Sequence, residues 1–462
     1  MYKGLKNIIV TIFILSSFHP AAQSVESRLG TAFESFENDP QLANAISSLY
    51  VQNASTGKVV FEKNGNIGLA PASTQKIITA ASAYEFLGKD FRYKTELGYQ
   101  GSIINNILKG DFYIKPSGDP TLGSWRWRST SDSLLLRHFM DAISKLNLKG
   151  YRGIEIYNEG WFQESIPDGW IWQDIGNYYG AGVGGFNWRE NQFDIFLASG
   201  NEIGSNVNII ETRPAIRTFR LDSYLKSAAK GTGDNAYVYY PLESDGGVIR
   251  GTIPVGEKRF SISASYPNVN KEFESIFRYV VNKGTGLNPM KYDGNPLNKT
   301  VIYTHYSPSI DSIIYWFNRK SINLYGEAIV KTIAFQNKGE GAISEGVKLI
   351  KDHWKSKGIS PTELNMYDGS GLSPLNRVTT KAQVEILQYA KKQSWYNGFY
   401  NSLPEFNGIK MKSGTISGVK AFTGYHKSKE GTEYIFSFIV NNYNGSASSL
   451  VQKMYTVLNV LK

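Results

Sequence analysis

A serine and a lysine stand three residues apart at the start of an apolar stretch, at Ser73 and Lys76. The residues that follow, up to Gly88, place apolar side chains at helical spacing, which predicts a largely buried helix. Residues i and i+3 of a helix lie one turn apart, so the amine of Lys76 would lie beside the hydroxyl of Ser73. This pair suits a serine nucleophile and its base, because burial lowers the pKa of a lysine towards neutrality.

The spacing by itself is a weak signal, because Ser-x-x-Lys occurs five times, starting at Ser55, Ser73, Ser223, Ser227 and Ser417. Only Ser73 stands at the N-terminus of a strongly apolar predicted helix, where the helix dipole favours negative charge on its oxygen. Taken in isolation, the same pair could equally be an N-cap serine followed by a surface lysine. The choice between the two interpretations depends on the rest of the sequence.

Two further motifs contain residues that could hold a substrate. The first lies at the junction of two helical stretches and reads Ser321-Ile322-Asn323. The second lies on a predicted strand and reads Lys412-Ser413-Gly414-Thr415. The glycine of the second motif lets a substrate approach the backbone closely. Each motif is common on its own, so the prediction depends on the order and the context of all three.

The combination of the three motifs resembles that of the penicillin-recognising serine enzymes, which share the order Ser-x-x-Lys, Ser-x-Asn and Lys-Ser/Thr-Gly. A gap of 248 residues separates Ser73 from Ser321, whereas 91 residues separate Ser321 from Lys412. The chain therefore resembles the class C low-molecular-mass penicillin-binding proteins, which are D-alanyl-D-alanine carboxypeptidases and endopeptidases with a large insertion after the first catalytic helix. Further matching segments are Ser117–Leu122, Trp172–Asp174 with Tyr178 and Tyr179, and Asp368–Ser373.

The resemblance implies how the first two motifs act. Ser73 would attack the carbonyl group between two D-alanines, with Lys76 as the base. Ser321 and Asn323 would complete a network of hydrogen bonds to the proton and the substrate. The middle motif departs from the family, because Ile322 stands where many members have Asp. The side chain of Ile322 has no hydrogen-bonding group, unlike the Asp of those members.

For the third motif, the resemblance implies binding of the transition state and of the end of the substrate. The backbone N–H groups of Ser73 and Thr415 would form the oxyanion hole, where one such donor is typically worth ~10²–10³ in rate. Lys412, with the hydroxyls of Ser413 and Thr415, would hold the terminal carboxylate of the peptide. Many members of the family have Thr in place of Ser413.

The predicted elements indicate an α+β fold. The resemblance implies that this fold is a penicillin-binding or serine β-lactamase-like transpeptidase domain, in which helices flank an antiparallel sheet. A hairpin of two short strands, at residues 48–52 and 58–62, opens this fold. Residues 25–89 form the first part of the catalytic domain, and residues 299–462 form the second part. The short aromatic and glycine-rich segments of residues 90–298 predict a β-rich insertion of two small subdomains.

Residues 1–24 are typical of a signal peptide, because Lys3 and Lys6 precede an apolar run, Ile8–Phe18, that is about half the ~20 residues of a membrane span. We therefore expect a protein secreted across the inner membrane and located in the periplasm or at the cell wall. The chain has no cysteine, which excludes disulfides, a lipoprotein anchor and thiolate catalysis. Its net charge of +10 is compatible with anionic cell-wall polymers and with contact at a membrane surface.

The expected partners are peptidoglycan stem peptides, with β-lactam antibiotics as covalent inhibitors. We expect no nucleic acid, because the basic residues form no Lys- and Arg-rich run. We also expect no cofactor and no metal, since His138, His305, His353 and His426 lack the spacing of metal ligands. Two alternatives stay open: a β-lactamase of the same lineage, and a non-catalytic peptidoglycan-binding protein. The aromatic cluster around Trp172 and Tyr179 could line a groove or belong to the core.

Overall fold

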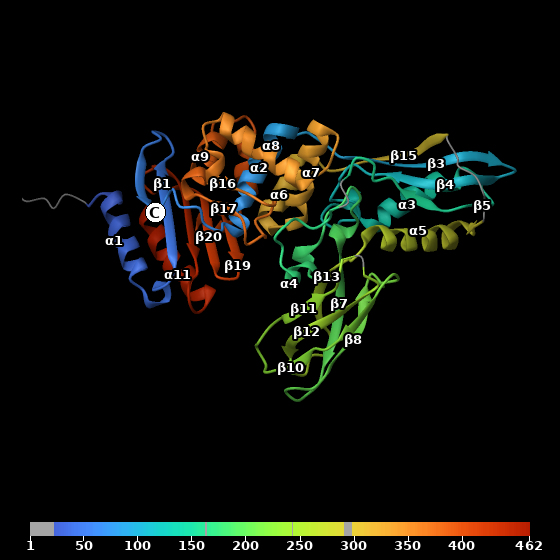
Figure 1. Ribbon diagram of the computed structural model, residues 1–462, viewed down its shortest axis with the longest axis horizontal. Coiled ribbons are helices and arrows are strands. Elements are labelled where there is room, and N and C mark those ends of the chain that lie inside the picture. The colour runs from blue at the N-terminus through green and yellow to red at the C-terminus, as the bar shows by residue number, and fades with distance from the viewer. Residues whose placement is uncertain (1–22, 162–163, 243, 291–297) are drawn as a thin grey trace, which may run out of the picture.

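An antiparallel sheet of six strands, in the order β18-β19-β20-β21-β1-β2, forms the centre of the catalytic region (Figure 1). The computed structural model describes residues 23–161, 164–242, 244–290 and 298–462. The strands are β1 (Ile46–Asn53), β2 (Val59–Lys63), β18 (Glu405–Phe406), β19 (Ile409–Ile416), β20 (Val419–Lys427) and β21 (Glu433–Asn441). The two ends of the chain share this sheet, because β1 pairs with β21 along its whole length.

Helices cover both faces of the sheet, because its central strands direct apolar side chains to either side. In β21, Phe436 and Phe438 face one core and Ile435 and Ile439 face the other. The first face is covered by α1 (Val25–Glu37) and α11 (Ala447–Leu458). The second is covered by α2 (Lys76–Leu87), α6 (Ile310–Lys320), α7 (Asn323–Lys338), α8 (Ile343–Ser356), α9 (Thr380–Ala390) and α10 (Tyr396–Ser402). A small ladder of β16 (Leu364–Asn365) and β17 (Arg377–Val378) lies beside these helices.

The inserted region begins with a mixed sheet packed against two helices, at the right of Figure 1. The sheet consists of β3 (Lys94–Ile104), β4 (Ile107–Lys115), β5 (Gly150–Tyr151), β6 (Ile154–Ile156), β14 (Asn288–Pro289) and β15 (Lys299–Tyr306). The helices are α3 (Asp132–Ser144) and α5 (Val269–Thr285), neither of which the sequence indicated. Because β15 pairs with β3, this sheet extends to Tyr306, beyond the boundary at residue 298 that the sequence suggested.

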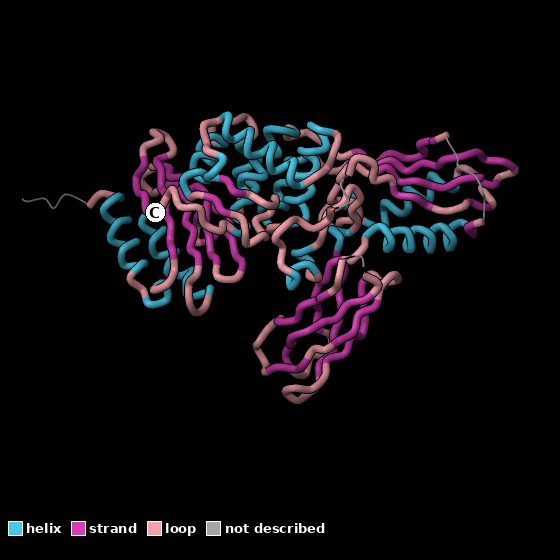
Figure 2. Tube along the Cα trace, viewed as in Figure 1, coloured by secondary structure: helices cyan, strands magenta, loops and turns pink. Residues whose placement is uncertain are grey.

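The second part of the insertion is built of strands alone and projects below the rest of the molecule (Figure 2). It contains a sheet of β7 (Gln192–Ser199), β8 (Val207–Arg213) and β13 (Phe260–Ser265). A second sheet contains β9 (Arg220–Ser223), β10 (Lys226–Ala228), β11 (Asn235–Tyr239) and β12 (Gly246–Pro254). Side chains of both sheets, such as Ile195 and Val238, form one core. A short helix, α4 (Trp172–Ile175), connects this part to the catalytic region and contacts β11.

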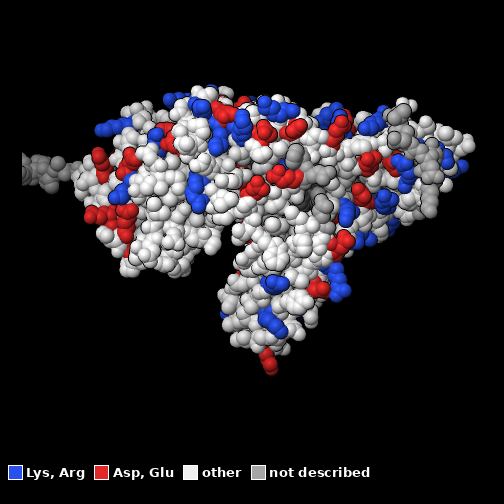
Figure 3. All heavy atoms as spheres, viewed as in Figure 1, with Lys and Arg blue, Asp and Glu red and all other residues white. Residues whose placement is uncertain are grey.

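The predicted signal peptide lies outside the described residues, apart from Gln23 and Ser24. Ser24 caps α1 by accepting a hydrogen bond from the backbone of Ser27. In the ranges that the structure describes, no helix has both the length and the apolar character needed to cross a membrane. On the face shown in Figure 3, Lys and Arg side chains lie among Asp and Glu side chains rather than in one continuous basic surface.

Candidate active site

Ser73 lies in a 3₁₀ turn, η2 (Ala72–Gln75), and Lys76 begins α2 directly after it. Lys76 Nζ lies 2.8 Å from Ser73 Oγ. Ala72, the residue before the serine, has a φ of 45°, a left-handed conformation that is costly for a residue with a Cβ atom. The fold therefore holds the serine hydroxyl on a strained turn, against the amine that the spacing predicted.

Lys76 is fully buried, and its Nζ has three oxygen atoms around it. Besides Ser73 Oγ, they are Asn323 Oδ1 at 2.6 Å and the backbone oxygen of Ser370 at 2.7 Å. Burial lowers the pKa of Lys76 to about 7, although the charges of Asp368 and Glu327 raise it in part. A lysine with this pKa is neutral in about half of the molecules at neutral pH, so it can accept the proton of Ser73.

The junction between α6 and α7 carries Ser321 and Asn323. Ser321 ends α6 with a φ of 55°, and Asn323 is the first residue of α7. The amide of Asn323 is held at both ends, because its Oδ1 accepts from Lys76 and its Nδ2 donates to the backbone oxygen of Tyr179 at 2.7 Å. Ile322, between them, lines the cleft and packs partly against the core. The middle residue of this motif therefore contributes an apolar surface.

Lys412 lies on β19, next to the junction between α6 and α7. Its Nζ donates to Ser321 Oγ and to the backbone oxygen of Ser413, both at 2.9 Å. The side chain is almost fully buried, and no carboxylate of the described residues forms an ion pair with it. Burial, with the nearby charges of Lys76 and Lys420, lowers the pKa of Lys412 well below its ordinary value. Such a group gains greatly from an anionic ligand.

Gly414 brings β19 against the turn that carries Ser73. A Cβ atom at this position would lie 2.5 Å from the backbone oxygen of Pro71 and 3.1 Å from the backbone nitrogen of Ser73. Because only glycine permits this approach, the end of β19 lies beside the serine, and both Ser73 and Thr415 line the same cleft. Thr415 is exposed, and its hydroxyl accepts from Lys420 Nζ at 2.7 Å.

The cleft has a volume of about 710 Å³ and lies between the catalytic region and the insertion. The catalytic region contributes the motif residues Ser73, Ser321, Asn323 and Thr415. The insertion contributes the opposite wall, which includes Arg126, Gln173, Asp174, Tyr178, Tyr179 and Glu190. Tyr178 and Tyr179 thus line the groove, whereas Trp170 of the same aromatic cluster is buried. Among the described residues, no group of three or more His, Asp and Glu side chains could hold a metal ion.

Comparison with known proteins identifies the family. A model of the D-Ala-D-Ala carboxypeptidase 3 (S13) family matches residues 29–405 and 407–459. The chain belongs to this family. It is 25% identical, over 91% of its length and 82% of the relative's, to the D-alanyl-D-alanine carboxypeptidase of an Actinomadura species. It is 23% identical to the D-alanyl-D-alanine carboxypeptidase DacB of Haemophilus influenzae, over 85% of each protein.

The fold agrees with a solved structure, that of penicillin binding protein 4 from Haemophilus influenzae. The two structures superpose with a TM-score of 0.79 at 18% identity, over 93% of this chain and 98% of that one. A structure of the same protein complexed with a β-lactam gives a TM-score of 0.72, also at 18% identity, over 93% of this chain and 98% of that one. The predicted family, the predicted fold with its split catalytic domain, and the predicted class of serine D-Ala-D-Ala carboxypeptidase/endopeptidase are therefore confirmed.

The site of this protein contains one feature that the motifs did not indicate, a loop held by two buried carboxyl groups. Asp368 accepts from the backbone nitrogens of Gly371 and Ser373, at 2.7 and 2.6 Å. Glu327 accepts from the backbone nitrogens of Gly369 and Ser370, at 2.7 and 2.9 Å. The loop is thereby fixed so that the Ser370 oxygen meets Lys76.

The sequence held a signal for both carboxyl groups. Asp368 begins the segment Asp368–Ser373, which the resemblance already marked, and Glu327 lies one helical turn after Asn323 on the same face of α7. Burial and the charge of Asp368 raise the pKa of Glu327 to about 8. The pKa of Lys76 therefore depends on a carboxyl group that does not line the cleft.

Proposed function

We propose that this protein cleaves the bond after D-alanine in peptidoglycan stem peptides, through an acyl-enzyme on Ser73. The observation that carries the proposal is the buried Lys76 amine, 2.8 Å from the Ser73 hydroxyl and with a pKa of about 7. A neutral amine at this distance can take the serine proton as Oγ attacks the carbonyl carbon. Membership of the carboxypeptidase 3 family supports D-alanyl peptides as the substrate class.

The reaction proceeds in two steps. Ser73 Oγ forms a bond to the carbonyl carbon, its proton moves to Lys76 Nζ, and the backbone N–H groups of Ser73 and Thr415 stabilise the oxyanion. The C–N bond then breaks, and the leaving amine takes the proton from Lys76. Water next attacks the ester, which releases the shortened peptide and restores the Ser73 hydroxyl.

Lys412 would recognise the carboxylate at the end of the substrate. Its buried Nζ donates to Ser321 Oγ and to the backbone oxygen of Ser413, and a peptide carboxylate would supply the negative charge that its surroundings lack. A carboxylate bound there would raise the lowered pKa of this lysine again and so favour its charged form. This arrangement supports cleavage next to a free carboxylate, as at the terminal D-alanine or at a D-alanyl crosslink.

The location of the protein is part of the proposal. The basic residues Lys3 and Lys6, followed by the short apolar run and small residues, support export and removal of the first 24 residues. The protein would then act in the periplasm or at the cell wall, where peptidoglycan is found. Without Lys3 and Lys6 the net charge is 10 − 2 = +8, which supports attraction to anionic wall polymers and to the membrane surface.

The first experiment is brief incubation of the purified mature protein with benzylpenicillin, followed by mass spectrometry and peptide mapping. We expect a stable adduct on the peptide that contains Ser73, and no adduct in Ser73→Ala. Ser55→Ala is the matched control, because Ser55 begins another Ser-x-x-Lys in the turn between β1 and β2. Rapid release of hydrolysed penicillin would instead favour a β-lactamase, and intact penicillin without an adduct would favour a wall-binding protein.

A further inference from the structure

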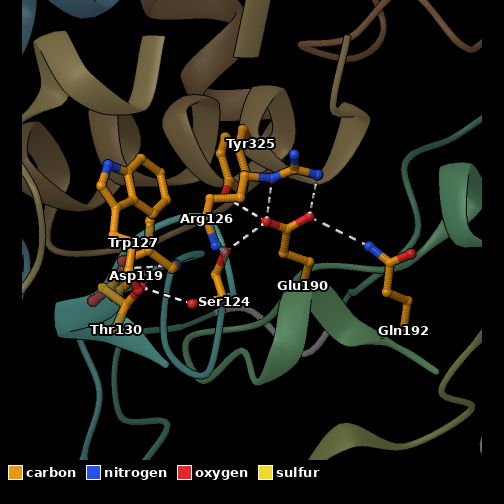
Figure 4. A network of polar contacts seen from close by, with 9 residues as sticks. Asp119, Ser124, Arg126, Trp127, Thr130, Glu190, Gln192 and Tyr325 are labelled. Carbon is orange, nitrogen blue, oxygen red and sulfur yellow. Dashed lines mark hydrogen bonds and ion pairs between the residues drawn. The ribbon is translucent and has the colours of Figure 1, made fainter. Parts of the chain in front are cut away.

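Glu190, in the insertion, is a buried carboxylate that accepts hydrogen bonds from four side chains (Figure 4). Its Oε1 accepts from Arg126 Nε at 2.7 Å, from Ser124 Oγ at 2.8 Å and from Tyr325 Oη at 2.7 Å. Its Oε2 accepts from Arg126 Nη2 at 3.0 Å and from Gln192 Nε2 at 3.3 Å. Three of these donor residues belong to the insertion, and Tyr325 belongs to α7. The Tyr325 hydroxyl therefore links the insertion to the catalytic region.

The backbone at Glu190 adopts a strained conformation. Arg189, Glu190 and Asn191 have φ values of 54°, 54° and 53°, so three consecutive residues with side chains are left-handed. The turn is fixed by a hydrogen bond from the Trp188 nitrogen to Asn191 Oδ1 at 2.9 Å. A second bond joins the Arg189 nitrogen to the Leu122 oxygen at 2.8 Å. Such a turn persists because its surroundings determine it, which indicates that the position of Glu190 matters.

Tyr325 lies two residues after Asn323, within the first turn of α7. Its side chain is fully buried, and its ring stacks on Trp127 of the insertion at a centroid distance of 6.5 Å. Burial and the charge of Glu190 raise the pKa of Tyr325 well above its ordinary value, so the hydroxyl stays a donor. Trp127 Nε1 also donates to Ser312 Oγ of α6 at 2.9 Å. Both helices that meet at the Ser321–Asn323 junction are therefore attached to the insertion.

The insertion makes a second contact with the same turn of α7, at the catalytic amide itself. The backbone oxygen of Tyr179 accepts from Asn323 Nδ2, while Asn323 Oδ1 faces Lys76 Nζ. The Tyr179 contact sets the rotation of the amide, and the Tyr325 contact sets the position of the helix that carries it. A shift of this turn would move Oδ1 away from Nζ, and small misplacements of a catalytic group can cost large factors in rate.

We propose that Glu190, acting through the Tyr325 hydroxyl, is a positioning residue for acylation, which holds the first turn of α7 so that Asn323 keeps Lys76 in place beside Ser73. The inference rests on the proposed function, because acylation of Ser73 is its readout. The insertion then does more than line the substrate cleft, since it completes the arrangement of groups around the base.

The test compares two Tyr→Phe variants whose hydroxyls both form hydrogen bonds at α7, one of them from within the helix and the other from the segment before β3. Tyr325→Phe removes the hydroxyl that reaches Glu190, and we expect the acylation rate constant at saturating benzylpenicillin to fall about tenfold, with little change in the dissociation constant of the initial complex. Tyr93→Phe is the control, because the buried Tyr93 hydroxyl accepts from Thr332 Oγ1 of α7, at 3.1 Å and far from Asn323 along the helix. Equal acylation rate constants in Tyr325→Phe and wild type, or equal losses in both variants, would overturn the proposal.

A double-variant cycle tests whether Glu190 acts through Tyr325. If it does, adding Tyr325→Phe to Glu190→Ala slows acylation no further than Glu190→Ala alone, whereas multiplied losses would contradict the proposal. Should Glu190→Ala fail to fold, the comparison of Tyr325→Phe with Tyr93→Phe still decides the question. The wild-type adduct separates the two hypotheses, because an absent adduct in wild type contradicts the proposed function, while an adduct formed equally fast in Tyr325→Phe contradicts only the role of Glu190.

Discussion

The catalytic region and the insertion both bury charged side chains, but they treat them differently. In the insertion, two buried carboxylates form ion pairs with guanidinium groups, Glu190 with Arg126 and Asp111 with Arg152. In the catalytic region, the buried ammonium groups of Lys76 and Lys412 are surrounded by neutral oxygen atoms, and neither forms an ion pair with a carboxylate of the described residues. Buried charged side chains thus occur both with and without an oppositely charged partner.

The presence or absence of an oppositely charged partner distinguishes buried groups that stabilise the structure from buried groups that can exchange a proton. A buried pair in good geometry stays charged and fixes the chain segments that carry it, because losing one partner leaves the other charge uncompensated. A buried lysine without a partner instead loses its proton more easily, and the lowered pKa of Lys76 is what the proposed role as base requires near neutral pH. Four changes test this contrast, in order of decreasing effect on acylation.

The largest effect is expected from Lys76→Met, which keeps the volume of the side chain and removes the base. We expect acylation by benzylpenicillin to slow by about 10³, within the usual range for loss of a general base. Lys331→Met is the control, because Lys331 is also buried in the catalytic region, and burial lowers its pKa to about 8. If Lys331→Met lowers the thermal midpoint but leaves acylation per folded molecule intact, reactivity depends on the place of the lysine and not on burial alone.

The second effect concerns the loop whose Ser370 oxygen accepts from Lys76. A Cβ atom on Gly371 would lie 1.9 Å from the backbone oxygen of Ala72, the residue before the nucleophile. We expect Gly371→Ala to slow acylation about 10²-fold, because the turn and the loop must move apart. Gly408→Ala is the matched control, since Gly408 also has a positive φ but nothing lies within 4 Å of its Cβ position. Stopped-flow acylation should show a similar loss in both variants only if the backbone conformation, and not the contact, is responsible.

A smaller effect is expected from Glu327→Gln, which removes a titratable carboxyl group behind the lysine. Because the pKa of Glu327 is about 8, its carboxyl group gains charge only as the pH rises above neutral, and that charge raises the pKa of Lys76. Without it, acylation should reach its maximum at a lower pH than in the wild type. At that maximum, where the lysine is neutral in either protein, we expect acylation about tenfold slower, because the loop is held less firmly. One backbone N–H of the loop would face an amide N–H, which should lower the free energy of unfolding by about 1–3 kcal/mol.

The exposed Glu340→Gln is the control for this change. Its acylation pH profile should coincide with that of the wild type. A profile for Glu327→Gln that also coincides would mean that the carboxyl group does not influence the charge of the lysine.

The sequence predicted the parts of this site that depend on local spacing. Ser73 and Lys76 are one turn apart, and Ile409 and Met411 alternate with Lys410 and Lys412 on a strand, so the contexts of these motifs follow from periodicity. The positions of Tyr179, Glu190 and Tyr325 depend on contacts between segments distant in the sequence, and one of these contacts uses a backbone oxygen that no side-chain pattern records. Helices α3 and α5 were overlooked for a related reason, because the many short strands around them dominated the pattern of the insertion.

The smallest effect on acylation is expected at His305, a buried titratable residue of the insertion. His305 is buried on β15, and its Nε2 has no hydrogen-bond partner among the described residues. Burial, with a smaller contribution from His138, lowers the pKa of His305 to about 4 from 6.5. Between pH 6.5 and about pH 4, the His305 imidazole is protonated in the unfolded chain but neutral in the folded protein. The free energy of unfolding therefore falls as the pH falls. The loss should reach about 2 kcal/mol by pH 5.

His305→Gln should remove this dependence, because glutamine does not titrate. Urea unfolding at pH 7 and pH 5 should therefore give a smaller difference in unfolding free energy for the variant than for the wild type, while acylation at pH 7 stays unchanged. Equal differences in the two proteins would mean that His305 takes up its proton without unfolding. If acylation changed as well, the His305 side chain in the insertion would influence Lys76. The two regions would then be coupled electrostatically as well as through the Tyr325 contact.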